Sequence, residues 1–130
     1  MRPFHLALCA ALLLAACSDS TGPLVFGRWA APGIELQAAG TTTELRLPCA
    51  IVSPLPPLRP GLDGRFSLRG RMTPTMLASP PGWALTLVGQ IRGDTIVADL
   101  VLRAGVAPPS TTHYVMVRGA DPQLIFACVA

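Results

Sequence analysis

The chain has 130 residues, and its ten basic side chains, all arginine, stand against seven acidic ones for a formal net charge of +3. This length favours one folded domain. A charge this small and dispersed does not provide the clustered basic surface that nucleic-acid binding requires, so we expect no nucleic-acid binding. We also expect a monomer.

The first sixteen residues have the pattern of a secretory signal peptide. Arg2 and His5 precede an apolar run that ends in small residues, and the run is shorter than the roughly 20 residues that a membrane-spanning helix needs. Its end, Leu14-Ala15-Ala16-Cys17, resembles the lipobox of bacterial lipoproteins. The resemblance implies cleavage before Cys17 and attachment of lipid to its thiol. The alternative is an ordinary signal peptide in which Cys17 has no such role.

The lipobox resemblance also implies a domain plan and an address. We expect a signal peptide over 1–16, a lipidated flexible tether over 17–23 and one domain over 24–130. Two or three acyl chains suffice for stable anchoring in a membrane. Ser18 after the cysteine resembles lipoproteins sent to the outer membrane of diderm bacteria. The predicted location is therefore the cell envelope, facing the periplasm, with the outer membrane favoured over the inner.

Four cysteines occur, and two of them are expected to remain as thiols of the folded domain. Cys9 leaves with the signal peptide and Cys17 receives lipid. Cys49 alternates in phase with Leu45, Leu47 and Ile51, and Cys128 with Leu124 and Phe126. In an oxidising compartment we predict a Cys49–Cys128 disulfide, with two unpaired core thiols as the alternative. We expect no metal site, because CxxC pairs and ligand clusters are missing from the sequence.

Apolar and polar residues alternate with a period of two along most of the chain after Leu24, which predicts strands and no helices. The alternating segments are 34–38, 45–51, 66–69, 83–92, 95–103, 113–117 and 124–128. Asp63-Gly64 and Gly93-Asp94 suit tight hairpins, and the proline-rich stretches 53–61, 73–82 and 107–110 suit loops. We predict an all-β fold, a small antiparallel up-and-down barrel of about eight short strands, with a β-sandwich as the alternative.

The segment Gly27-Arg28-Trp29 resembles the G-x-W motif that opens the first strand of lipocalins and related calycin barrels. In those families the tryptophan closes one end of the barrel and an arginine from a late strand packs over it. The resemblance implies that Trp29 closes this barrel and that Arg118, on the expected penultimate strand, covers it. The whole chain also resembles small bacterial lipoproteins with β-rich bodies, a likeness that implies no activity.

Residues for catalysis are sparse, and we expect a protein that is not an enzyme and uses no cofactor. His113 is the one histidine after the signal peptide and is expected to face solvent in mid-strand, and no G-x-S-x-G motif occurs. Glu35 and Asp99 lie on polar faces and are interpreted as solubilising charges. A ligand in the barrel would contact Arg118 and four aromatic residues, namely Trp29, Phe66, Trp83 and Tyr114. The alternative role of these aromatic residues is packing in the core.

Three functions follow from these observations as hypotheses. The first is a lipid-anchored extracytoplasmic binding module for a small ligand or an envelope component, with an apolar pocket open at one end of the barrel. The second is an inhibitor or accessory lipoprotein that docks on a protein through loops 53–61 or 73–82, with a filled barrel. The third, a minor one, is a hydrolase with His113 beside a serine or an acid in a cleft. Arg69 and Arg71 share a face, and Arg92 and Arg103 lie on neighbouring strands of one hairpin, which suggests a positive patch for an anionic polymer, lipid headgroup or protein. The alternative is dispersed, solvated charge paired with Asp99 and Glu44.

Overall fold

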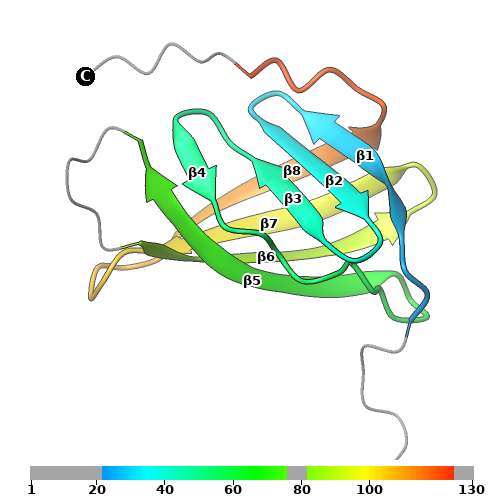
Figure 1. The fold of residues 1–130 in the computed structure, drawn as a ribbon, viewed down its shortest axis with the longest axis horizontal. Coiled ribbons are helices and arrows are strands. Elements are labelled where there is room, and N and C mark those ends of the chain that lie inside the picture. The colour runs from blue at the N-terminus through cyan, green and yellow to red at the C-terminus, as the bar shows by residue number, and fades with distance from the viewer. Residues whose placement is uncertain (1–21, 76–81, 125–130) are drawn as a thin grey trace, which may run out of the picture.

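The computed structural model describes residues 22–75 and 82–124, and within these ranges the regular structure consists of eight strands. Figure 1 shows them in chain order. Their bounds are β1 (Phe26–Ala31), β2 (Ile34–Ala39), β3 (Thr43–Arg46), β4 (Ala50–Val52), β5 (Arg65–Pro74), β6 (Trp83–Arg92), β7 (Thr95–Arg103) and β8 (Ser110–Arg118). Within the same ranges the chain forms no apolar helix of membrane-spanning length.

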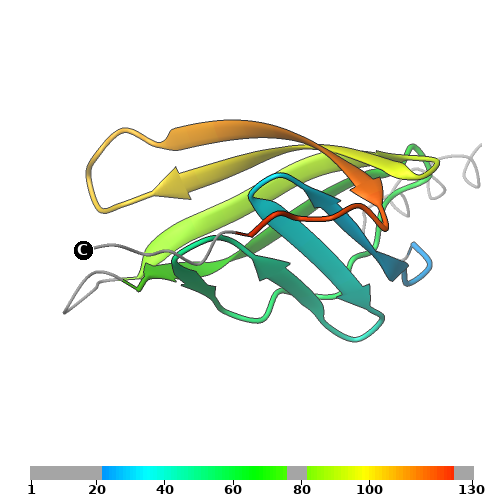
Figure 2. The ribbon, with the colours of Figure 1, turned by 90° about the horizontal axis from the view of Figure 1, so that it is seen from above.

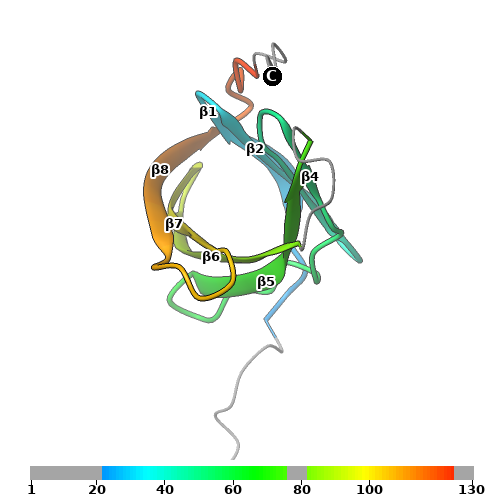
Figure 3. The ribbon, with the colours of Figure 1, turned by 90° about the vertical axis from the view of Figure 1, so that its left-hand side faces the viewer.

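The eight strands form one antiparallel sheet that curls into a nearly closed barrel (Figure 3). The strand order is β3-β2-β1-β8-β7-β6-β5-β4, so neighbours along the chain pair with each other and β8 returns to β1. The two edge strands, β3 and β4, follow each other along the chain, and Thr43 of β3 forms a bridge with Leu55, three residues after β4. This arrangement confirms the all-β, up-and-down barrel predicted from the alternation.

Alternation of burial along the strands follows the alternation in the sequence. On β5, Phe66 and Leu68 are buried, whereas Arg65, Ser67 and Arg69 are exposed, because successive side chains of a strand point to opposite faces. The turn after β6 has the expected two residues, since Arg92 pairs with Thr95 across it. Gly93 takes φ +59 in that turn, a conformation that glycine adopts without steric cost.

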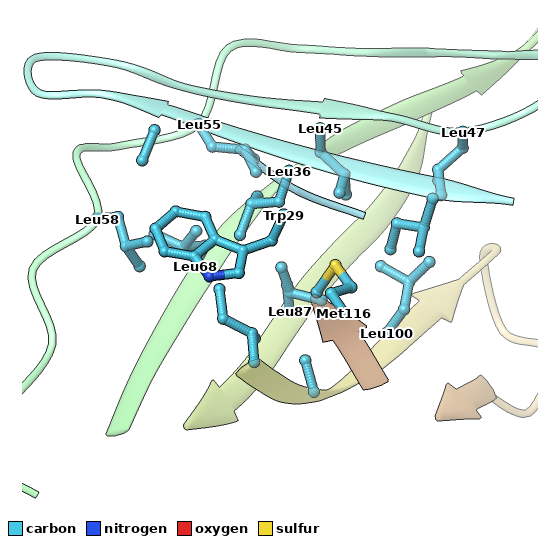
Figure 4. Packing of buried hydrophobic residues seen from close by; sticks show 14 of the residues in the cluster. Trp29, Leu36, Leu45, Leu47, Leu55, Leu58, Leu68, Leu87, Leu100 and Met116 are labelled. Carbon is cyan, nitrogen blue, oxygen red and sulfur yellow. The ribbon is translucent and has the colours of Figure 1, made fainter. Parts of the chain in front are cut away.

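The inside of the barrel is filled by buried apolar side chains. Figure 2 shows β2 and β3 facing β6 and β7 across the barrel, and Figure 4 shows the side chains that meet inside it. Trp29, Ile34, Leu36, Leu87, Ile96 and Met116 have no exposed surface at all. One cluster of 18 buried apolar residues includes members of β1, β2, β3, β5, β6, β7 and β8.

The proline-rich segment 53–61 is part of this core rather than a free loop. Leu55 is 3% exposed and Leu58 is 1% exposed, and both belong to the buried cluster. The backbones of Thr43 and Leu55 exchange hydrogen bonds, at 3.3 and 3.0 Å, and Val25 N donates to Leu58 O. The segment therefore covers the gap between β3 and β5 and completes the barrel wall.

The expected single strand over 45–51 is wrong. The chain turns at Pro48 and Cys49, which separates β3 from β4, and Cys49 has φ +55. Proline cannot donate a hydrogen bond to a ladder, and the turn carries the chain from one edge of the sheet to the other. The phase changes across the turn: Leu45 is buried, whereas Ile51 is 65% exposed.

The predicted strand over 124–128 falls almost entirely outside the described residues. Arg118 ends β8, the last strand that the structure describes. Residues 119–124 contain no strand. Phe126 and Cys128, which were expected to continue a strand from Leu124, lie outside the described residues.

Candidate functional site

Trp29 and Arg118 meet where β1 pairs with β8. The two residues are register partners, and the Arg118 guanidinium carbon lies 4.5 Å from the centroid of the fully buried Trp29 ring. A cation over an aromatic face is attracted by the ring's electron density. Arg118 also donates to Phe26 O at 3.3 Å and lies 3.6 Å from a carboxylate oxygen of Asp94. The structure thus brings Trp29 and Arg118 together as expected.

Gly27 has a physical role in the same place. Its φ is +151, and a Cβ there would lie 2.8 Å from the Arg118 guanidinium and 3.0 Å from the Trp29 ring. A side chain at this position would therefore displace the stacked pair. The spacing of glycine and tryptophan, with Arg28 pointing outward between them, suits the closure of this barrel end.

The other aromatic candidates are spread along the barrel. Phe66 and Tyr114 share one inward-facing row across β5–β8, with Gly89 and Ala98 between them. Phe66 is buried beneath Gly89 and Tyr114 is half-buried. Burial raises the pKa of Tyr114 above its usual value of 10.0. Trp83, half-buried at the start of β6, lies six residues from the Gly89 row, roughly 20 Å away. The four aromatics therefore do not converge on one cavity.

Of the three cysteines assigned roles, the structure describes Cys49. It is half-buried in the turn before β4, and Thr75 N donates to its carbonyl oxygen at 3.0 Å. Cys17 and Cys128 lie outside the described residues. Lipid attachment at Cys17 and the Cys49–Cys128 disulfide stay predictions.

His113 contacts an acid on the outer face of the barrel. Its Nδ1 lies 2.7 Å from Oδ1 of Asp99, and the two side chains are 60% and 52% exposed. Both line a shallow depression of about 390 Å³ over β5–β8. Ser67 of β5 lies level with Asp99 of β7 in the strand register, but Val88 of β6 stands between them. Among the described residues the side-chain partner of His113 is Asp99, and no hydroxyl or thiol is hydrogen-bonded to the imidazole.

Glu35 is not the solubilising surface charge that the sequence suggested. Its side chain is 7% exposed, and its carboxylate lies 3.2 Å from Arg28 and 3.8 Å from Arg46. These arginines come from β1 and β3 on either side of β2. Ionic side chains are rarely buried unless paired, and here two arginines pair with one acid.

The arginines of the outer face divide into two groups at opposite ends. Arg92 lies beside the turn between β6 and β7, whereas Arg103 pairs in register with Ala84 at the far end of the same hairpin. The expectation that Arg92 and Arg103 form one patch is therefore wrong, because antiparallel pairing separates the two ends of a hairpin. Ala84 also pairs with Arg71 of β5. Arg71 and Arg103 therefore flank the same residue, a relation that only the register could reveal.

Metal binding has no candidate group among residues 22–75 and 82–124, since no three His, Cys, Asp or Glu side chains there gather suitably. Comparisons with protein-family models, with curated proteins and with solved structures found no match. The small, nearly closed barrel of eight antiparallel strands is compatible with a lipocalin-like body.

Proposed function

We propose that this chain is a lipid-anchored docking module of the bacterial cell envelope, which binds its partner with the outside of its barrel. One observation carries the proposal: the inside of the barrel is packed with apolar side chains. An eight-stranded barrel is wide enough either to fill itself with side chains or to hold one small ligand. Here the buried cluster extends from Trp29 at one end to Leu47 and Met72. This packing favours docking over storage of a ligand.

The packed interior is tested by titrating the full chain with a fluorescent fatty acid as an apolar probe. We expect no saturable binding and no change in the melting temperature. Saturable binding of one probe per chain, with quenching of the buried Trp29, would overturn external docking in favour of a ligand carrier.

The anchor rests on the sequence segment 14–17 and is tested separately. Cells that express the full chain and are fed labelled palmitate should label the protein. The Cys17→Ser variant should lose the label and leave the membrane fraction, whereas the control variant Cys49→Ser should keep it. Label retained in Cys17→Ser would contradict the anchor.

A further inference from the structure

We propose that Arg69, Arg71 and Arg103 form a binding site for the phosphate groups of an anionic envelope polymer. The site lies on the outer face of β5, β6 and β7, at the end of the barrel remote from Phe26. The inference rests on the proposed external docking and names the class of partner that the barrel would contact. It is defined by three side chains, called the arginine triad below.

The strand register places the triad around two small residues of β6, Ala84 and Thr86, which are called the floor of the site below. Arg71 and Arg103 both pair with Ala84, from opposite sides, and Arg69 pairs with Thr86. Two interstrand spacings put the Cα atoms of Arg71 and Arg103 roughly 10 Å apart. Ala84 is exposed and Thr86 half-buried, and all three arginines are exposed. Because alanine is short, the space above it is open to both flanking guanidinium groups.

The orientation of one arginine supports this arrangement. Arg71 Nη1 lies 3.4 Å from the carbonyl oxygen of Gly82, two residues before Ala84 on the neighbouring strand. The guanidinium thus reaches from β5 toward β6. Arg103 stands on β7, on the other side of Ala84, and Thr86 adds a hydroxyl group to the floor.

The positive charge of the triad is not neutralised by the described part of the chain. Six of the seven acids lie there, and each contacts a group other than the triad. Glu35 and Glu44 pair with arginines of β1 and β3, and the others contact Arg65, Arg118, His113 or a backbone amide. The triad is therefore a local excess of three positive charges without a carboxylate partner among the described residues.

The chemistry of the triad fits phosphate. A guanidinium group is planar and presents its N–H donors in a fork that matches two oxygens of a phosphate or carboxylate. A phosphate ester, with several anionic oxygens, engages more than one guanidinium at once. Three arginines with Cα atoms within roughly 12 Å of one another therefore suit an anion with several oxygens better than an isolated carboxylate.

The place of the triad favours a polymer over the headgroups of the anchoring membrane. The described chain begins at Gly22, which lies against Pro60, and Gly61 N donates to Arg65 O at the start of β5. Arg71 lies six residues farther along β5, roughly 20 Å away. A tether that leaves the barrel beside Pro60 is attached at the end opposite the triad, which leaves the triad accessible to a polymer beyond the leaflet that holds the anchor.

The test compares two triple variants of the full chain, purified from membranes in detergent. Arg69→Gln/Arg71→Gln/Arg103→Gln removes the triad. The control removes the same charge from three other exposed arginines, Arg59→Gln/Arg65→Gln/Arg92→Gln. The probes are linear polyphosphate, inorganic phosphate and vesicles containing phosphatidylglycerol. Melting curves verify that each variant is folded. If a triple variant does not fold, the single variant Arg103→Gln is used in its place.

We expect polyphosphate affinity to fall about tenfold or more in the triad variant, because charge-assisted hydrogen bonds are lost, and less than twofold in the control. Inorganic phosphate should compete, and weakly. Equal losses in both variants would overturn the inference, because they would show binding by net charge alone. Triad-dependent binding of vesicles without binding of polyphosphate would also overturn it. If the phosphate-site inference is overturned, the proposal of external docking is unaffected, because the fatty-acid titration tests it separately.

Discussion

Replacing Arg118 by methionine tests whether the stacked pair at the β1–β8 junction stabilises the barrel. Methionine keeps the apolar stem of the side chain and removes the guanidinium. The cation lies 4.5 Å from the Trp29 centroid on a side chain that is 45% exposed, a setting in which stacking contributes about 1 kcal/mol. The long hydrogen bond to Phe26 O adds about 0.5 kcal/mol. Asp94 is 82% exposed, so that ion pair contributes close to nothing.

The expected loss in the free energy of unfolding is therefore about 1.5 kcal/mol, or roughly 7 °C in Tm for a domain of this size. Urea denaturation followed by circular dichroism measures it. The control is Arg92→Met, which removes an exposed arginine whose side chain, within the described part of the chain, is bonded only to Gln90, and it should change stability by less than about 0.5 kcal/mol. In a Trp29→Leu background most of the Arg118 effect should vanish. Equal losses for Arg118→Met and Arg92→Met, or an undiminished loss without Trp29, would refute the reasoning.

Three further predictions concern other parts of the barrel. Burial raises the pKa of Tyr114, the one tyrosine of the chain, so the stability tied to its neutral form is complete below about pH 10 and is lost as pH rises through the folded-state pKa. Between about pH 9 and about pH 11, the Tm of the unmodified protein should therefore fall more than the Tm of Tyr114→Phe. Equal falls in the two proteins would contradict this. Gly89→Ala places a Cβ 2.8 Å from Ala98 Cβ and should lower the free energy of unfolding, measured by urea denaturation, by about 1–3 kcal/mol. The control Gly82→Ala, whose Cβ would have 3.8 Å of clearance, should lower it far less. Similar losses in the two variants would argue against tight packing at Gly89. Mass spectrometry of the unreduced mature protein should find a peptide linking Cys49 to Cys128, and complete alkylation of both thiols would disprove the pairing.

The fold was predictable because its signals are local. Period-two alternation marks the long strands β6 and β7, and Gly93-Asp94 marks the turn between them. These features give the face and direction of each strand without knowledge of its partners. The stacking of Arg118 over Trp29 was accessible through the resemblance of Gly27-Arg28-Trp29 to calycin barrels.

The errors arose where burial or register depends on distant parts of the chain. Glu35 is buried because Arg28 and Arg46 cover it from two neighbouring strands, which the sequence around Glu35 does not reveal. Alternation places residues on a face and does not say which end of a hairpin they occupy, so Arg103 was grouped with Arg92 instead of Arg71. The core role of the segment 53–61 was hidden by its prolines.

The pairing of β1 with β8 has a consequence for folding. All other strand ladders join neighbours along the chain, but this one brings together residues such as Phe26 and Arg118, 92 positions apart. Closing a loop of that length costs about 3 kcal/mol more in chain entropy than closing a four-residue hairpin. The hairpins of β5–β8 can form before this cost is met, and the β1–β8 ladder cannot. We therefore expect barrel closure to be the late, slow step, with the apolar interior open to water until β1 pairs with β8.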